Sequence, residues 1–159
     1  MSIAIHNLAD VPEHMPVIAG WLNGEWGVIR NEPMEQTLAL LRSNTLKDQW
    51  PFVLVALEND TPVGTASLIL DDMPTRPEFS PWLADVYVPN TKRKEGIGKK
   101  LVEAVAAEAT RLGVEKIYLF TASNTKLYEL LGWQLLERTE YRGEPVRIMT
   151  KRLRVEAVE

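Results

Sequence analysis

The chain has 159 residues, 45% of them hydrophobic and 25% charged, which is typical of globular proteins, and we expect a single domain over residues 1–159. It contains no cysteine and only two histidines, so disulfides, thiolate metal sites and cysteine nucleophiles are excluded and no metal cofactor is expected. The formal net charge of −4 argues against nucleic acid as a partner, because phosphate binding needs a positive field.

One strand and two helices are predicted in the first third of the chain. Residues 2–8 alternate polar and apolar side chains, which favours a strand. Asp10 is followed three residues later by a glutamate, the pattern of a helix N-cap, and the helical pattern that follows extends to Trp26. Pro33 indicates the first turn of a second helix over residues 33–44.

A hairpin, a loop and a buried strand are predicted next. The apolar runs 51–58 and 65–70 form the two strands of the hairpin, joined by a turn over residues 59–64. Residues 71–81 contain three prolines and are expected in a surface loop. The apolar run at 82–88 predicts a buried strand.

The last part of the chain predicts a strand-helix-strand unit and a terminal hairpin. Residues 96–113 have the most regular helical pattern in the chain, with apolar residues on one face. A strand over 114–121, a short helix over 124–132 and a hairpin over 133–153 follow. The strands at 82–88 and 114–121 flank a helix, so we expect them to be parallel and joined by a right-handed crossover. The fold class is therefore a mixed α/β sheet.

The sequence RKEGIGKK, residues 93–100, places two glycines at the start of the long predicted helix. Free amides and the positive end of the helix dipole favour an anion there, most often a phosphate. A P-loop needs Ser or Thr after the lysine, and a dinucleotide loop needs a third glycine where Leu101 stands, so both are excluded. The alternative is a simple turn into the helix beside a solvated run of basic residues. No aromatic residues interleave this run, which again disfavours nucleic acid.

A longer segment, VYVPNTKRKEGIGKKLVEAV, resembles the signature of the GNAT superfamily of acetyl-CoA-dependent N-acetyltransferases. Arg93, Gly96 and Gly98 match its Arg-x-x-Gly-x-Gly core, and LYELLGW, with Tyr128 and Gly132, is similar to the second motif of the family. The order of elements along nearly the whole chain also resembles the family. This resemblance implies a mixed, mostly antiparallel sheet of about six or seven strands flanked by about four helices.

The resemblance also implies that acetyl-CoA is the cosubstrate and that no metal takes part. In the family the loop amides hold the pyrophosphate, and the strand before the loop meets the pantetheine arm through its backbone. The cofactor-binding residues implied here are Val86, Tyr87, Val88, Arg93, Lys94, Glu95, Gly96, Ile97, Gly98, Lys99 and Asn124. Many members carry an asparagine seven residues before the tyrosine; that residue is Thr121 here, so Thr121 and Asn124 stay open as alternatives for the pantetheine contact.

Tyr128 is the candidate catalytic residue. A thiolate that leaves when an amine attacks a thioester needs a proton, and a tyrosine with a pKa near 10 is protonated at neutral pH and can donate it. The alternative is that Tyr128 packs with Leu127, Leu130 and Leu131 on the core face of its helix. The general base is either a relayed water or one of the carboxylates Asp85, Glu25, Asp71 and Asp72. If Asp85 is buried, it needs a structural partner.

The acceptor site is expected between the first two helices and the proline-rich loop. Its candidate residues are Glu25, Trp26, Trp82 and Asp85. The acceptor amine is open among a peptide N-terminus, a lysine side chain, an aminoglycoside, a polyamine and an amino-acid-like metabolite. The expected reaction is acetyl transfer to this amine by direct attack in a ternary complex. The alternative is a non-catalytic acyl-CoA sensor, which would have no need of Tyr128.

Location and assembly follow from weaker signals. No window approaches the roughly 18 apolar residues of a membrane span, and the N-terminus lacks a basic segment followed by a long apolar run. We therefore expect a cytoplasmic protein with no membrane partner. A homodimer is plausible, since many members of the family pair through their terminal strands.

Overall fold

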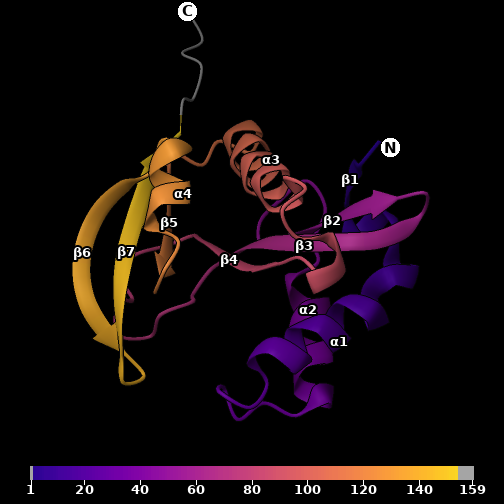
Figure 1. Ribbon diagram of the computed structural model, residues 1–159, viewed down its shortest axis with the longest axis horizontal. Helices are drawn as coiled ribbons and strands as arrows, with labels where there is room; N and C mark the ends of the chain where they lie inside the picture. The colour runs from indigo at the N-terminus through magenta and orange to yellow at the C-terminus, as the bar shows by residue number, and fades with distance from the viewer. Residues whose placement is uncertain (1, 154–159) are drawn as a thin grey trace, which may run out of the picture.

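Seven strands form one sheet in the order β1-β2-β3-β4-β5-β7-β6 in the computed structural model, which describes residues 2–153 (Figure 1). The strands are β1 Ala4–Asn7, β2 Phe52–Glu58, β3 Thr61–Ile69, β4 Trp82–Tyr87, β5 Lys116–Thr121, β6 Gln134–Tyr141 and β7 Glu144–Arg152. The helices are α1 Met15–Trp26, α2 Met34–Asn44, α3 Ile97–Arg111 and α4 Thr125–Leu130. Only β4 and β5 pair in parallel, and every other pair is antiparallel. The predicted mixed, mostly antiparallel sheet is confirmed.

Helices cover both faces of the sheet. Helix α3 packs on one face of β2 to β4, while α1 and α2 lie against the other (Figure 1). The apolar stripe of α3, which includes Leu101, Val105 and Ala109, is fully buried, because this face meets the sheet along the length of the helix. No helix within residues 2–153 combines the length and apolar character needed to cross a membrane.

Two local predictions differ from the structure. Helix α1 begins at Met15 after two short 3₁₀ turns, so Asp10 is not its cap; the Asp10 carboxylate instead accepts hydrogen bonds from Lys47. The turn of the first hairpin contains only Asn59 and Asp60, both at positive φ, and β3 already begins at Thr61. Asn and Asp tolerate the left-handed region, which allows this tighter turn.

The pairing of β4 with its two neighbours is irregular. Against β3, Ala84 pairs with Ser67 and Tyr87 with Thr65, so β4 contains one extra residue and forms a bulge. Asp85, within this bulge, has φ of 55°. Against β5, the only pair in register is Trp82 with Tyr118. Beyond that pair the two strands no longer bond to each other, so the sheet divides there.

Gly64 on β3 allows α3 to approach the sheet closely. A Cβ at this position would lie 2.8 Å from Leu101 Cδ1, 3.0 Å from Ile97 Cγ2 and 3.3 Å from the Tyr87 carbonyl oxygen. All three neighbours belong to packed or paired segments, and Leu101 and Ile97 are buried. Any side chain here therefore pushes α3 away from the sheet.

We expect Gly64→Val to lower the free energy of unfolding by about 1 to 3 kcal/mol, because it overpacks the contact between α3 and β3. Urea unfolding followed by circular dichroism measures this change. The control is Gly24→Ala in α1, where a Cβ meets no atom within 4 Å. Gly24→Ala should leave stability unchanged or raise it by up to about 1 kcal/mol. Equal stability of Gly64→Val and the parent protein would contradict the close approach.

Candidate active site

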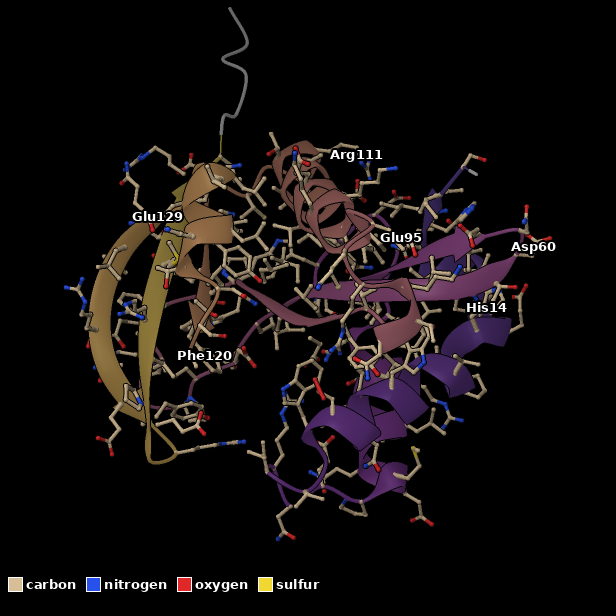
Figure 2. The ribbon with its side chains drawn as sticks, in the orientation of Figure 1. His14, Asp60, Glu95, Arg111, Phe120 and Glu129 are labelled. Carbon is tan, nitrogen blue, oxygen red and sulfur yellow. The ribbon has the colours of Figure 1, made fainter. Side chains whose placement is uncertain are left out.

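A cleft of about 780 Å³ lies where β4 and β5 separate. One wall is formed by the end of β4, residues 86–88, and the other by the end of β5 and the loop after it, residues 120–124. Figure 2 labels Phe120, which lies on the β5 wall, and Glu95, which lies in the loop that leads into α3. The separation of the strands therefore opens this cleft between them.

The loop before α3 presents backbone amides at one end of this cleft. Gly96 is the N-cap of α3 and has φ of 81°, a left-handed conformation that glycine adopts without strain. The first bond of the helix runs from the Lys100 amide to the Gly96 carbonyl, at 3.1 Å, so the three preceding amides have no partner within the helix. Gly98 lines the cleft, and an added Cβ would lie 3.8 Å from Val88 Cγ2. This end of the cleft is suited to an anionic group.

Arg93 connects the loop to β4. Its Nε donates a hydrogen bond of 2.8 Å to the Val88 carbonyl oxygen, and its guanidinium lies 5.8 Å from the centre of the Tyr87 ring. The guanidinium also lines the cleft, where it adds positive charge beside the free amides of α3. Arg93 thus fixes the loop and contributes to its affinity for an anion.

Tyr128 lies in the wall of the cleft on α4. The residue is 8% exposed, and its ring packs edge-to-face against Trp133 with 6.0 Å between ring centres. Burial raises the pKa of Tyr128 above its ordinary value of about 10. Its hydroxyl is therefore protonated at neutral pH. The ring packs in the core while the residue also lines the cleft, and the catalytic role of Tyr128 stays a prediction.

The loop after β5 places Thr121 and Asn124 together. Both residues line the cleft. The Thr121 hydroxyl oxygen accepts hydrogen bonds from the Ser123 amide, at 3.3 Å, and from the Asn124 amide, at 3.0 Å. Thr121 therefore shapes the turn that leads into α4, and a contact of either side chain with a cosubstrate stays a prediction.

The opposite end of the cleft lies between α1 and the β6–β7 hairpin. Glu25 and Trp26 approach from α1, and Tyr141, Arg142 and Glu144 approach from the hairpin. Trp26 packs edge-to-face with a tyrosine of β4, with 6.4 Å between ring centres. We refer to this part of the cleft, where the sequence-based acceptor residues Glu25 and Trp26 lie, as the acceptor end, and its role stays a prediction.

Trp82 does not belong to this end, contrary to its sequence-based assignment to an acceptor pocket. It is fully buried in a core cluster with Phe79 and Tyr118, and its indole Nε1 donates to the Phe79 carbonyl oxygen. Trp82 is the first residue of β4, at the end where β4 and β5 are still paired, and so it lies away from the cleft.

Asp85 faces a second cavity of about 240 Å³ instead of the main cleft. It accepts a hydrogen bond of 2.9 Å from Arg30 Nη2, which supplies the structural partner expected for a buried carboxylate. Burial opposes the positive charge of Arg30, but Asp85 outweighs this effect and the pKa of Arg30 is raised. The guanidinium also lies 5.1 Å from the centre of the Trp26 ring. Arg30 thus connects the α1–α2 loop to the bulge in β4.

Asp72 lines the same second cavity, and its pKa is strongly raised. Burial, followed by the negative charge of Asp85, raises the pKa of Asp72 to about 7, although Arg30 and Arg142 act in the opposite direction. Asp71 is exposed at the rim of this cavity. Of the four carboxylates considered as a general base, only Glu25 lines the main cleft.

Nine of the predicted site residues meet in the main cleft: Glu25, Trp26, Val86, Tyr87, Val88, Arg93, Gly98, Asn124 and Tyr128. Lys94, Glu95, Gly96 and Lys99 lie exposed in or beside the loop, and the Ile97 side chain is buried in the core below it. Within residues 2–153, no three His, Cys, Asp or Glu side chains are grouped in a way that would hold a metal ion.

Sequence reasoning missed the residues that close the acceptor end, chiefly Arg30, Phe120, Tyr141 and Arg142. The sequence correctly predicted the hairpin turn near Arg142, but no periodic signal tells which way such a turn faces. The position of Arg30 in a loop after α1 gives no signal either.

A family model described as the acetyltransferase (GNAT) family matches residues 15–133. The chain belongs to this family. Both GNAT motifs lie inside the matched region, whereas the residues of the β6–β7 hairpin that line the cleft lie outside it. The predicted family is thereby confirmed, and the protein is a GNAT acetyltransferase. No match was found among curated proteins.

Solved structures with low sequence identity share the GNAT fold of this chain. An aminoglycoside 6'-N-acetyltransferase complexed with coenzyme A has a TM-score of 0.74 at 17% identity, over 99% of this chain and 100% of that one. YncA from Salmonella typhimurium, solved with its cofactor acetyl-CoA, has a TM-score of 0.75 at 20% identity, over 100% and 98%. A GNAT acetyltransferase from Streptococcus pneumoniae has a TM-score of 0.70 at 17% identity, over 96% and 99%.

The perturbed carboxylate of Asp72 predicts how the stability of this GNAT protein depends on pH. The folded protein binds the proton of Asp72 up to about pH 7, whereas an unfolded chain releases it near pH 4. Folding stability therefore falls as pH rises through this window. We expect Asp72→Asn to raise the free energy of unfolding by about 1 to 4 kcal/mol at pH 8 and to have little effect at pH 4.

Chemical denaturation of both proteins between pH 4 and pH 8 measures this difference. Asp60→Asn is a matched control, since Asp60 is exposed in the turn between β2 and β3 and Asn tolerates its positive φ. A difference between Asp72→Asn and the parent that does not change with pH would show that the carboxylate is not perturbed.

Proposed function

We propose that this protein transfers the acetyl group of acetyl-CoA to an amine by direct attack within a ternary complex. The observation that carries the proposal is the position of Tyr128, a protonated and largely buried residue in the wall of the same cleft that holds the free amides of α3. An acid and an anion site in one cleft suit a thioester attached to a long phosphorylated arm.

The residues of the cleft fit such a cosubstrate. The amides at the start of α3, with Arg93 and the space above Gly98, would hold the pyrophosphate. The end of β4, unpaired on the side that faces β5, would offer its backbone groups to the pantetheine arm. Acetyl-CoA supplies, when bound, an acetyl thioester whose sulfur is a good leaving group. The structures of other GNAT proteins with coenzyme A or acetyl-CoA support this assignment.

Tyr128 acts as the general acid. The amine nitrogen forms a bond to the acetyl carbon, the bond between that carbon and sulfur breaks, and the phenolic proton passes to the departing sulfur. The nitrogen loses one proton, so the products are an acetamide and a free thiol, and this proton restores Tyr128 through solvent. Burial supports the role, since it keeps the hydroxyl protonated until the sulfur takes the proton.

Glu25 is our candidate for receiving the amine proton, directly or through water. It lines the acceptor end of the cleft and is exposed, so a proton that it receives can pass on to solvent. Asp85 is held by Arg30 in the neighbouring cavity, and we assign it no proton transfer. A non-catalytic acyl-CoA sensor is the alternative function, and the test of Tyr128 separates the two.

Three further proposals concern the chain as a whole. Residues 1–159 form a single domain, supported by one sheet that incorporates strands from both ends of the described chain. The protein forms a homodimer through β6, supported by the edge position of this strand and by exposed Leu135 and Leu136 on it. It works in the cytoplasm, where acetyl-CoA is made and used.

We expect Tyr128→Phe to lower kcat by about 100-fold, because the leaving sulfur loses its proton donor. The dissociation constant for coenzyme A should stay within about twofold, since the phenyl ring keeps its packing against Trp133. Steady-state kinetics on a panel of amines and calorimetric titration with coenzyme A measure the two quantities.

The matched control is Tyr118→Phe, which removes a hydroxyl from a tyrosine that lines neither cavity. It should change kcat by less than about threefold. An unchanged kcat in Tyr128→Phe would remove the acid role, and a parent protein that binds acetyl-CoA but acetylates no amine would favour the sensor.

We expect Gly98→Val to weaken coenzyme A binding by at least about 30-fold, because its side chain would enter the cleft beside Val88 and block the approach to the α3 amides. Calorimetric titration measures the affinity, and a thermal melt checks that the variant is folded. Full coenzyme A affinity in folded Gly98→Val would contradict the assignment of the phosphate site.

A further inference from the structure

The second cavity opens beside the acceptor end of the main cleft. Arg30, Tyr141 and Arg142 line both hollows, so the two adjoin at these residues. The cavity lies against α1 and α2 on one side and against the loop after β3 on the other, the region where Asp71, Asp72 and Pro74 are found. A molecule seated at the acceptor end of the cleft can therefore extend into it.

Negative charge predominates around this cavity. Its lining includes four carboxylates, of Glu32, Asp71, Asp72 and Asp85, but only the two cationic side chains of Arg30 and Arg142.

Three of these carboxylates are stabilised by a partner or by water. Asp85 is paired with Arg30, Glu32 accepts a hydrogen bond from the Thr37 hydroxyl, and Asp71 is exposed to water. Asp72 differs, because it is partly buried in the wall of the cavity and makes no hydrogen bond or ion pair with any other described residue. A carboxylate that is partly removed from water and has no partner is costlier to ionise than one in water.

The groups that face Asp72 come from every surrounding element. They are Asp71 in the same loop, Asp85 on β4, Arg30 and Glu32 between α1 and α2, and Arg142 in the β6–β7 turn. Their combined effect leaves the pKa of Asp72 raised to about 7, so the two arginines do not compensate the burial. A cation beside Asp72 would supply the missing partner.

We propose that this cavity is an acceptor subsite in which Asp72 binds a second ammonium group of a diamine or polyamine, while the reacting amine of the same molecule lies in the main cleft near Tyr128. The proposal rests on the acetyl transfer proposed above. The volume of about 240 Å³ equals that of about eight water molecules and accommodates a short aminoalkyl arm. Aromatic Tyr141, which lines both hollows, would cover the methylene chain between the two nitrogens.

The test is calorimetric titration of amines into the protein saturated with coenzyme A, at pH 8. The probes are straight-chain diamines of three to six carbons, the monoamines of the same lengths, and 4-aminobutanoate, in which a carboxylate replaces the second ammonium. We expect one diamine to bind at least about tenfold more tightly than its matched monoamine, and 4-aminobutanoate to bind more weakly than either.

Asp72→Asn tests the residue itself. The ratio of diamine to monoamine affinity should fall to nearly one in this variant, whereas the exposed-turn control Asp60→Asn keeps the parent ratio. Figure 2 shows Asp60 at the far tip of the β2–β3 hairpin. The affinity of the parent for the diamine should fall about tenfold between pH 8 and pH 6, as Asp72 takes up a proton, and Asp72→Asn should lose this dependence.

Several outcomes would overturn the subsite. They are equal affinities for diamines and monoamines at every length, a diamine advantage that survives in Asp72→Asn, tighter binding of 4-aminobutanoate, or no binding of any diamine at millimolar concentration. Failure of coenzyme A to bind would instead overturn the proposed function, and titration of the diamines into the free protein would still report on the subsite.

Discussion

The separation of β4 from β5 is the constraint on which the candidate active site depends. These strands form the one parallel pair of the sheet and keep a single pair in register, between Trp82 and Tyr118. The bulge at Asp85 adds a residue to β4 beyond this pair, and Arg30 holds the Asp85 carboxylate from the α1–α2 loop. The unpaired ends then form opposite walls of the cleft, one leading to the amides of α3 and the other to Tyr128. A regular parallel pair would leave no room between them.

The two ends of the cleft differ in how far apart in the sequence their residues lie. The anion end is local, because a loop with two glycines and the first turn of α3 supply all its amides. The acceptor end is assembled from α1, the loop after it, the loop after β3 and the β6–β7 hairpin, which are far apart in the sequence. The proposed pyrophosphate site, which one continuous segment supplies, is thus joined to a proposed acceptor site whose parts can vary separately.

This difference between local and long-range parts explains which site residues could be predicted from the sequence. Gly96, Gly98 and Tyr128 were found because each belongs to a short motif whose geometry is set within a few residues. The direction of Asp85 was not predictable, since alternation along β4 fails at a bulge that only pairing with β3 reveals. Trp82 was misplaced for a related reason, as strand periodicity does not tell which end of a strand stays paired. The second cavity requires loops whose relative positions no sequence pattern encodes.

The sheet can be divided into two parts, β1 to β4 and β5 to β7, which are paired with each other at Trp82. Helix α3 and the loops flanking it connect the two parts covalently. Backbone hydrogen bonds between β4 and β5, however, are nearly absent beyond the first residues of β4. The boundary between these two parts of the sheet, where few backbone hydrogen bonds form, is therefore also the place of the main cleft. A ligand bound at this boundary contacts both parts of the sheet, so its binding stabilises their association. The bound cosubstrate would thus lie between β4 and β5 in the position of a strand and link the two parts of the sheet.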